Sequence, residues 1–356
     1  MKPFVYQGRA QRVVFGAGST EQLGAELNAL GLKRPLLLCT PTQRDQAERV
    51  AKQLGDAEVV GVFDQAVMHV PIETVRQART LADREGADCT LAVGGGSTIG
   101  LGKAIALEFG VPIIAVPTTY AGSEMTPIYG ITEASLKKTG NDLRVLPAVV
   151  IYDSLLSMEL PVALSITSGI NAIAHAAEGL YARDGNPVMD LMAQEGIRAL
   201  AKAIPVIHTG AGEALAQARE EALYGAWLCG SVLGNVGMAL HHKLCHTLGG
   251  SCNLPHAEVH TVVLPHALAY NALAAPDAME RIATALGSND AAQGVFDLAL
   301  AHGAPTSLRA LGMRAQDLDR VCDIAMQVPY PNPRPLEKAA LRTLLQNAFE
   351  GLRPDS

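Results

Sequence analysis

Short apolar segments alternate with amphipathic segments over residues 1–153, and this alternation limits the fold more than any other feature of the chain. The apolar segments are rich in Val, Ile and Leu and end at Gly, Thr, Pro or Asp, which is typical of strands. Strands and helices in alternation predict a parallel sheet that is covered on both faces. We expect strands at residues 34–40, 58–63, 89–96, 111–119 and 148–153, with helical segments between several of them.

The second half of the chain has a different pattern. Long segments with helical periodicity follow one another, and no comparable strand pattern returns. A chain of 356 residues also has room for two domains. We therefore predict an α/β domain over residues 1–153 and an all-helical domain over residues 154–356. The longest expected helices span residues 165–183, 187–206, 213–249, 255–273, 277–286 and 291–302.

A glycine-rich turn, GGGS at residues 94–97, lies between one expected strand and the helix that follows it. Glycines allow a ligand to approach the backbone closely, and the start of a helix offers unpaired N–H groups and a positive dipole end. A pyrophosphate group suits such a turn. The pattern is not GxGxxG, however, and a tight strand–helix connection is the alternative interpretation.

The next expected strand ends in the hydroxyl-rich loop PTTYAGSE, residues 117–124. Two such loops at the carboxyl edge of a parallel sheet form the crevice in which nucleotides bind. The first domain, residues 1–153, is therefore predicted to be a Rossmann-like dinucleotide-binding domain. The residues expected to bind the cofactor are Gly94, Gly95, Gly96, Ser97, Thr118, Thr119 and Ser123.

The choice between NADH and NADPH often depends on an acidic residue near the end of an early strand. Here that strand ends in CTPTQR, residues 39–44, which contains no Asp or Glu. Nothing in this segment repels a 2′-phosphate, and Thr42 or Arg44 is placed to assist it. We therefore predict that the protein uses both NADH and NADPH.

Five polar residues in the helical half are spaced so that they can share a site. Asn171 and His175 are four residues apart, hence on one face of a helix, and His242 and His246 repeat this spacing. His256 follows a proline at an expected helix start. Buried polar groups need partners, and a shared ligand or water supplies them, whereas a lone histidine is more often a core residue. Because histidine both binds metals and titrates near neutral pH, a metal site and a proton-transfer site remain open.

These residues also carry a resemblance. The chain resembles the iron-containing alcohol dehydrogenase family in GGGS (94–97), PTTYAGSE (117–124), NAIAH (171–175), HHKLCH (241–246) and PH (255–256). In metal-dependent members of that family an Asp and three His hold the ion, and the corresponding positions here are Asn171, His175, His242 and His256, with His246 as a nearby catalytic histidine. The resemblance implies a fold that dehydroquinate synthases share, an NAD(P)H cofactor and a homodimer.

Three positions depart from the metal-dependent pattern. Asn171, a neutral amide, stands where those members have the carboxylate, and an amide offers a divalent cation only a weak carbonyl oxygen. Gly100 stands where the dehydrogenases commonly have an Asp, and the threonine-rich loop is altered to TTYAGSE. Together these changes resemble a branch of the family that reduces an unsaturated keto dicarboxylate and is regarded as working without metal. We therefore expect no metal.

Reduction of a carbon–carbon double bond conjugated to a carbonyl does not require a Lewis acid, because hydrogen-bond donors can hold the developing enolate. A dianionic substrate also suits a site rich in imidazoles, and the amide at position 171 removes a charge that would repel it. The proton donor is predicted to be His242, His246 or Tyr120. The expected catalytic group is His175, His242, His246, His256, Tyr120 and Asn171, with Lys243, His242 and Tyr120 binding the substrate.

Composition argues against other partners. A net charge of −7 without a Lys/Arg-rich run disfavours nucleic acid, and apolar runs such as VPIIAVP are far shorter than the roughly 20 residues that span a membrane. The N-terminal residues lack the apolar segment of a secretory signal, and the six cysteines form no CxxC pair. We therefore expect a cytoplasmic protein with reduced cysteines.

Other functions remain open at this point. One is a metal-dependent alcohol dehydrogenase, with iron or zinc, that tolerates Asn171. Another is a cyclase like the dehydroquinate synthases, which use NAD transiently, although the basic residues for a phosphate substrate are scarce here. A non-catalytic nucleotide-binding protein is disfavoured by the number of imidazoles.

Overall fold

A six-stranded parallel sheet forms the core of the first half of the chain in the computed structural model, which describes residues 3–134, 136–328 and 330–355. The strand order is β1-β8-β5-β4-β2-β3, and each neighbouring pair runs parallel. The structure thus confirms the predicted parallel sheet and adds one strand, β1. The strands are β1 (Arg12–Phe15), β2 (Pro35–Leu38), β3 (Gly61–Phe63), β4 (Cys89–Gly94), β5 (Ile113–Pro117) and β8 (Val149–Tyr152).

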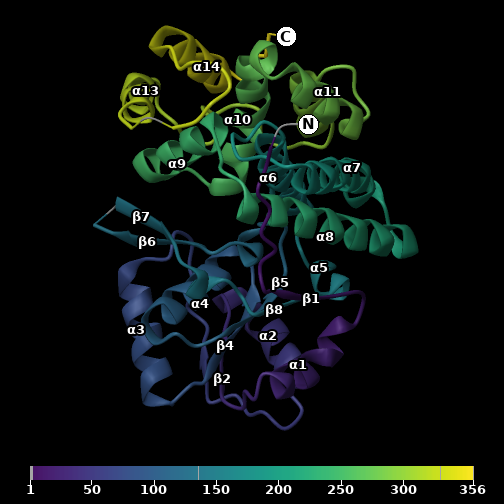
Figure 1. Ribbon diagram of the computed structural model, residues 1–356, viewed down its shortest axis with the longest axis vertical. Helices are drawn as coiled ribbons and strands as arrows, with labels where there is room; N and C mark the ends of the chain where they lie inside the picture. Colours follow the sequence, from purple (N-terminus) through teal and green to yellow (C-terminus); the bar gives the residue numbers. More distant parts are fainter. Residues whose placement is uncertain (1–2, 135, 329, 356) are drawn as a thin grey trace. The chain divides into compact units, whose positions relative to one another are not determined.

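Helices cover both faces of this sheet. Helices α1 (Leu23–Ala29) and α2 (Arg44–Ala51) share a hydrophobic core with one face. Figure 1 shows α3 (Ile72–Arg84) and α4 (Gly96–Phe109) on the opposite side. Strands β2, β4, β5 and β8 are buried at every residue, which explains why their sequences are continuously apolar rather than alternating.

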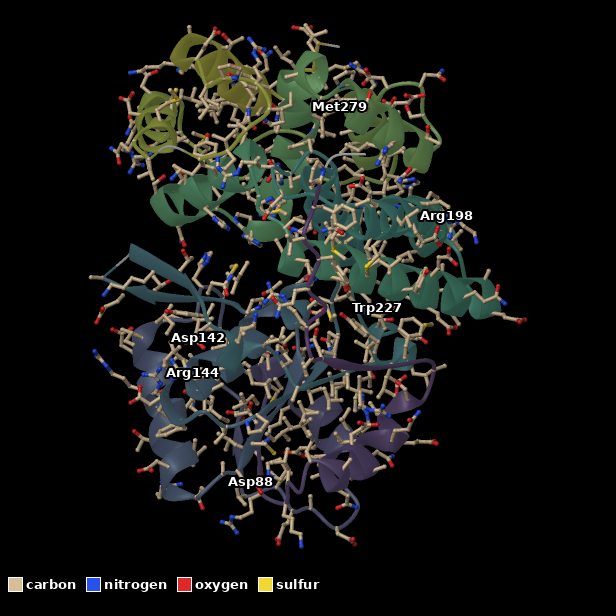
Figure 2. The ribbon with its side chains drawn as sticks, in the orientation of Figure 1. Asp88, Asp142, Arg144, Arg198, Trp227 and Met279 are labelled. Atoms are coloured by element: carbon tan, nitrogen blue, oxygen red, sulfur yellow. The ribbon has the colours of Figure 1, made fainter. Side chains whose placement is uncertain are left out.

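An antiparallel hairpin forms a separate sheet that the sequence analysis did not predict. It consists of β6 (Ile128–Glu133) and β7 (Leu136–Asn141), the second of which reads LKKTGN and lacks the apolar alternation of a half-buried strand. Arg144 pairs with Asp142 at 2.7 Å directly after the hairpin (Figure 2). The short elements of this half are η1 (Ser19–Gln22), η2 (Pro41–Gln43), η3 (Ser123–Met125), η4 (Leu143–Val145) and α5 (Ser154–Ser157).

The second half is helical, as predicted, and within the described ranges no strand follows Tyr152. Helices α7 and α8 lie side by side, and α9, α10, α13 and α14 share one hydrophobic core (Figure 1). The helices are α6 (Val162–Leu180), α7 (Pro187–Thr209), α8 (Gly212–Asn235), α9 (Leu240–Cys252), α10 (His256–Asn271), α11 (Pro276–Leu286), α12 (Ala291–Ala301), α13 (Leu318–Met326) and α14 (Lys338–Glu350), with η5 (Ala272–Ala274) and η6 (Ala315–Asp317).

One predicted helix is wrong. The segment 213–249 forms two helices, α8 and α9, which are bent by 95° at a break. The chain is extended at Val236, and the break contains Gly237, whose flexibility disfavours a continuous helix. His242 and His246 therefore lie in the first turns of a separate helix rather than at the end of a long one.

The chain divides into two compact units. The first, here called the α/β unit, spans Gln7–Leu160, and the second, here called the helical unit, begins at Pro161 and includes the N-terminal segment that ends at Tyr6. The predicted boundary lies earlier, after Asp153. Among the described residues no single helix has the length and apolarity to cross a membrane, although α8 and α9 taken as a bent pair meet that criterion by composition.

Candidate functional site

The glycine turn of the α/β unit has no room for a side chain at Gly94 or Gly95. Strand β4 ends at Gly94 and helix α4 begins at Gly96. A Cβ on Gly94 would lie 2.5 Å from Oγ1 of Thr98, and a Cβ on Gly95 would lie 2.9 Å from the side chain of Thr119. The backbone is therefore bare where the first N–H groups of α4 lack helical partners, which is the arrangement that accepts a phosphate.

The loop after β5 lies beside this turn, because β4 and β5 are neighbours and Gly94 is in register with Pro117. Gln43 Nε2 donates to Thr118 Oγ1 at 2.8 Å, and Thr40 Oγ1 donates to Gln43 Oε1 at 3.0 Å. The carboxyl ends of β2 and β5 are thus joined through one amide. Gln43 was not among the predicted residues, since nothing in CTPTQR distinguishes it from a surface residue.

A buried lysine holds the rest of that loop. Lys103 Nζ donates to the carbonyl oxygens of Ser123, Thr126 and Ile128 at 2.6, 2.8 and 2.7 Å, and burial lowers its pKa to about 7. Glu124 is also buried, which raises the pKa of its carboxyl. Tyr120, a predicted catalytic residue in this loop, has a fully buried side chain.

Arg44, predicted to assist a 2′-phosphate, is already paired. Its guanidinium lies 2.9 Å from Glu48 and 2.7 Å from Asp64. Asp64 directly follows β3, the strand next to β2. Residues 39–44 contain no acidic side chain, but Asp64 brings a carboxylate close to them from the end of the neighbouring strand β3.

The helical unit brings the predicted polar residues of three helices together. Asn171 and His175 lie on α6, His242 and His246 on α9, and His256 is the first residue of α10, as the preceding proline predicted. His175 Nδ1 lies 2.8 Å from His242 Nε2, and Asn171 Nδ2 lies 3.4 Å from His175 Nε2. The ring of His246, an exposed residue, is centred 6.2 Å from that of His242.

A glutamate that the sequence analysis missed continues this chain of contacts. Glu178 Oε2 lies 2.7 Å from His242 Nδ1 and accepts the backbone N–H of Ala239 at 2.8 Å, while Oε1 accepts the N–H of His241 at 2.8 Å. The same carboxylate therefore caps the start of α9. Burial alone would raise the pKa of Glu178, but its hydrogen bonds with His242 and the backbone outweigh this and lower it.

We call the residues Asn171, His175, His242 and Glu178 the imidazole chain. A signal for its last member was present in the sequence. Glu178 follows His175 by three residues and Asn171 by seven, so that all three lie on one face of α6.

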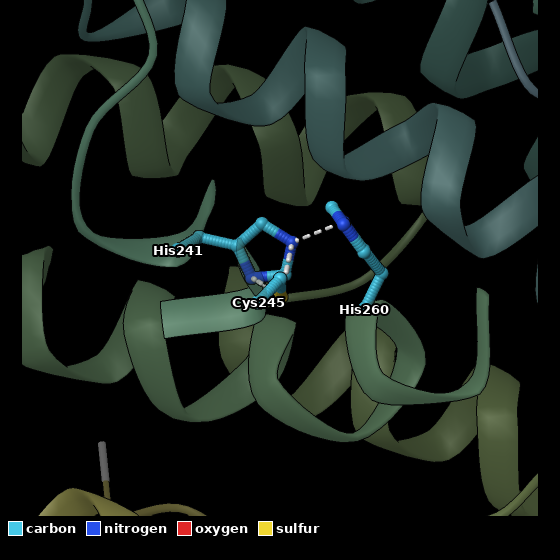
Figure 3. A group of neighbouring side chains, drawn as sticks. All are labelled: His241, Cys245 and His260. Atoms are coloured by element: carbon cyan, nitrogen blue, oxygen red, sulfur yellow. Dashed lines mark hydrogen bonds between the residues drawn. The ribbon is translucent and has the colours of Figure 1, made fainter. Parts of the chain in front are cut away.

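Behind the imidazole chain lies a second layer of buried groups, His241, Cys245 and His260 (Figure 3). Their potential ligand atoms lie within 4.8 Å of one another, a spacing that an ion could use. However, His241 Nε2 and His260 Nδ1 bond to each other at 2.9 Å. Burial lowers the pKa of both imidazoles and raises that of the Cys245 thiol. These features favour a neutral packed layer over an ion site.

In the family that this chain resembles, metal-dependent members hold the ion at positions that here lie within hydrogen-bond distance of one another. Nitrogens bound to one tetrahedral zinc at about 2.0–2.1 Å stand roughly 3.3 Å apart, whereas His175 Nδ1 and His242 Nε2 approach to 2.8 Å, a hydrogen-bond distance. Asn171 adds no charge to this set. His175 therefore bonds to both Asn171 and His242, and no carboxylate stands at position 171.

Lys243, predicted to bind the substrate, is half-buried on α9. Its ammonium lies 5.9 Å from the centre of the Tyr330 ring, a cation–π distance. Lys243 therefore contacts the segment after α13, whereas the preceding residue, His242, contacts α6.

Comparison with known proteins gives matches along the whole chain. Residues 10–154 match the model of the iron-containing alcohol dehydrogenases, and residues 165–349 match the C-terminal model of the same family. A maleylacetate reductase from Burkholderia cepacia is 59% identical over 99% of this chain and 100% of the relative.

Solved structures agree in fold. The maleylacetate reductase from Agrobacterium tumefaciens has a TM-score of 0.94 and 54% identity over 99% of this chain and 100% of its own. An iron-containing alcohol dehydrogenase from Corynebacterium glutamicum has a TM-score of 0.91 and 42% identity over 98% of this chain and 97% of its own.

Proposed function

Since the chain belongs to the iron-containing alcohol dehydrogenase family, we propose from this premise that it reduces the carbon–carbon double bond of maleylacetate with NADH or NADPH. The product would be 3-oxoadipate, an intermediate of aromatic-compound breakdown. Two relatives named maleylacetate reductase, 59% and 56% identical to this chain, support the substrate. The observation that carries the proposal is Asn171, an amide bonded to His175 at a position where a metal would need a carboxylate.

The glycine turn and the loop after β5 would hold the cofactor. The N–H groups at the start of α4 suit its pyrophosphate. Thr118 and Thr119 directly follow the adjacent strand β5, and Ser123 begins η3 in the same loop. The reduced nicotinamide supplies the hydride. Both NADH and NADPH are expected, with the pairing of Arg44 to Asp64 setting their ratio.

The imidazoles of the helical unit would serve the substrate. Hydride addition to one alkene carbon leaves an enolate, and hydrogen-bond donors can stabilise its charge while an acid protonates the other carbon. His256 and Lys243 would orient the keto oxygen and the carboxylates, His175 and His242 would line the site, and an uncharged Asn171 avoids repelling a dianion. The proton would come from His242, His246 or Tyr120.

The reaction is proposed to proceed without metal, because position 171 offers an amide instead of a carboxylate and the nitrogens of the site bond to each other. The alternative is a metal-dependent alcohol dehydrogenase. The 42% identity to the Corynebacterium glutamicum iron-containing alcohol dehydrogenase is the observation that favours it.

One assay separates these functions. Purified protein is incubated with EDTA, desalted, and mixed with NADH and maleylacetate while absorbance of NADH is followed. We expect steady NADH oxidation at the same rate as in untreated protein. Loss of activity on chelation with recovery on adding zinc or iron would overturn the metal-free mechanism. Oxidation of simple alcohols with no turnover of maleylacetate would overturn the substrate, and absence of net NADH oxidation would favour a cyclase.

We also propose a homodimer in the cytoplasm, with no nucleic acid or membrane partner. The resemblance to the family implies the dimer, and six cysteines without a CxxC pair suit a reducing compartment. Light scattering coupled to size-exclusion chromatography tests the dimer against the 37.4 kDa mass of one chain.

A further inference from the structure

We infer that Glu178 is a positioning residue that sets which nitrogen of His242 and of His175 carries the proton, and that Asn171 is an amide because this chain of hydrogen bonds must end in a donor. The inference rests on the proposed function for its kinetic consequences. The protonation pattern itself can be measured without any substrate.

The direction of the chain begins at Glu178. Its oxygens accept the backbone N–H groups of Ala239 and His241 at 2.8 Å each and that of His242 at 3.3 Å, and Tyr181 Oη donates to Oε1 at 3.3 Å. A fully buried carboxyl surrounded by donors acts as an acceptor. The His242 Nδ1 that lies 2.7 Å from Oε2 must therefore carry a hydrogen.

The remaining assignments follow from the chemistry of imidazole. A neutral imidazole has one N–H donor and one acceptor nitrogen, so His242 Nε2 is an acceptor. His175 Nδ1, 2.8 Å away, must then donate, which leaves His175 Nε2 as an acceptor. Asn171 places its Nδ2 group, a donor, 3.4 Å from that nitrogen. Each contact pairs one donor with one acceptor.

This direction explains why an amide suits position 171. A carboxylate there would face the acceptor nitrogen of His175 with two more acceptors, and only a proton or a cation between them would relieve the conflict. The amide supplies its own hydrogen. Glu178 and Asn171, at opposite ends of the imidazole chain, are therefore complementary.

A consequence for the reaction follows. The N–H groups of His175 and His242 are both directed along the imidazole chain, so that neither is aimed at a substrate. Of the proton donors considered above, His246 and Tyr120 remain. His242 then contributes by holding its ring in place rather than by giving up a proton.

The first test uses the unmodified protein. With histidine labelled by ¹⁵N, nuclear magnetic resonance distinguishes a nitrogen that carries a hydrogen from one that does not, and the variants His175→Gln and His242→Gln assign the signals. We expect Nδ1–H and a bare Nε2 at both residues at neutral pH. An Nε2–H form at His242 or His175 would overturn the inference, whatever the substrate of the enzyme.

The second test changes the ends of the chain. Glu178→Gln replaces one acceptor oxygen by a donor, and we expect the proton of His242 to move to Nε2 and kcat to fall at least about a hundredfold, with KM for NADH little changed. Tyr181→Phe is the matched control: it removes a hydrogen bond to the same carboxylate, and we expect kcat to stay within about twofold. A folded Glu178→Gln protein with the wild-type proton position would contradict the inference.

Asn171→Asp tests the other end. Two acceptors then face each other, so we expect this variant to take up Zn²⁺ where the wild type does not and to lose at least about tenfold in kcat in the presence of EDTA. Metal analysis and the spectrophotometric assay measure both. If Asn171→Asp keeps the kcat of the wild type in the presence of EDTA, the role assigned to Asn171 is wrong. Failure of the wild type to turn over maleylacetate, with the expected proton positions, would instead count against the proposed function alone.

Discussion

At the residue scale, the two predicted site histidines of α9, His242 and His246, differ in their surroundings. His242 is buried against Glu178, whereas His246, one turn further along α9, is exposed. An exposed imidazole can exchange its proton with water, and a buried one held by a carboxylate keeps its orientation. The two rings are therefore suited to different tasks, although the sequence spacing makes them look equivalent.

Removal of the His242 or the His246 side chain should lower kcat strongly. We expect His242→Ala and His246→Ala each to lower kcat with maleylacetate about a hundredfold or more, through lost positioning and lost proton transfer respectively. Steady-state kinetics measure this. His208→Ala is the control, because His208 is exposed and bonds to the backbone of His302 outside the cluster. Near-normal kcat in both cluster variants would remove these residues from the chemistry.

Asp64 should influence the choice of cofactor. Its carboxylate pairs with Arg44 at 2.7 Å and would repel a 2′-phosphate there. We expect Asp64→Asn to raise the ratio of kcat/KM for NADPH over NADH about tenfold, the effect of about 1.4 kcal/mol. Asp56→Asn, which removes an equal charge at the other end of β3, should leave the ratio unchanged. In the wild type, a preference for NADH beyond about a thousandfold would contradict dual use.

Residue spacing predicted much of the candidate site, but not the partners that orient it. Asn171, His175, His242 and His256 were identified because helical periodicity and a proline place them on helix faces. Glu178 could have been found by the same spacing. Gln43 could not, because its role depends on β2 and β5 being two strands apart in the sheet, which sequence patterns do not specify.

At the element scale, the break between α8 and α9 is the main difference from expectation. Apolar periodicity runs through residues 213–249, and Gly237 alone is a weak sign of a stop. The break is stabilised from outside, by the carboxylate of Glu178 on the N–H groups that begin α9. A tertiary contact of this kind has no local signal. The strands were easier, since burial on both faces gives them continuous apolar sequences.

The glycine at position 100 of α4 is explained by its neighbour. A Cβ there would lie 2.8 Å from Cγ2 of Val70, a stiff side chain on a backbone with φ of 48°. We expect Gly100→Ala to lower the free energy of unfolding by about 1–3 kcal/mol, although alanine normally favours a helix. Urea denaturation measures the change.

The matched control for this substitution is the double variant Val70→Ala/Gly100→Ala. With the methyl contact removed, the alanine at position 100 should be neutral or stabilising relative to Val70→Ala alone, by up to about 1 kcal/mol. Equal destabilisation in both backgrounds would show that the contact with Val70 is not the cause.

At the scale of the whole molecule, buried neutral histidines should make the protein sensitive to acid. Burial lowers the pKa of His266 to about 4 from 6.5, and those of His241 and His260 in the same direction. Between pH 6.5 and 4 the unfolded chain therefore binds more protons than the folded one, and stability falls as the pH falls. Above pH 6.5 these groups are neutral in both states and contribute no slope.

His266→Leu isolates one of these groups. We expect the wild type to lose about 2–3 kcal/mol more than this variant between pH 7 and pH 4.5, from a pKa difference of about two units over that window. Denaturant unfolding at the two pH values measures the difference. Parallel losses in both proteins would mean that His266 is protonated in the folded state as easily as in the unfolded one.

The two units were predictable because their sequence patterns differ strongly. The same patterns place the glycine turn in the α/β unit and the imidazoles in the helical unit. The boundary was harder to place. Helix α5 lies after the last strand and still belongs to the α/β unit, so the change from strand to helix in the sequence precedes the division of the chain.

The carboxylate of Glu178 both stabilises the start of α9 and orients the ring of His242. A nascent molecule that has not yet docked α6 against α9 has neither a stable start to that helix nor an aligned imidazole, and it acquires both in one event. Incompletely folded molecules should consequently have no activity rather than reduced activity. The specific activity of a refolding sample would then be proportional to the fraction of fully folded molecules.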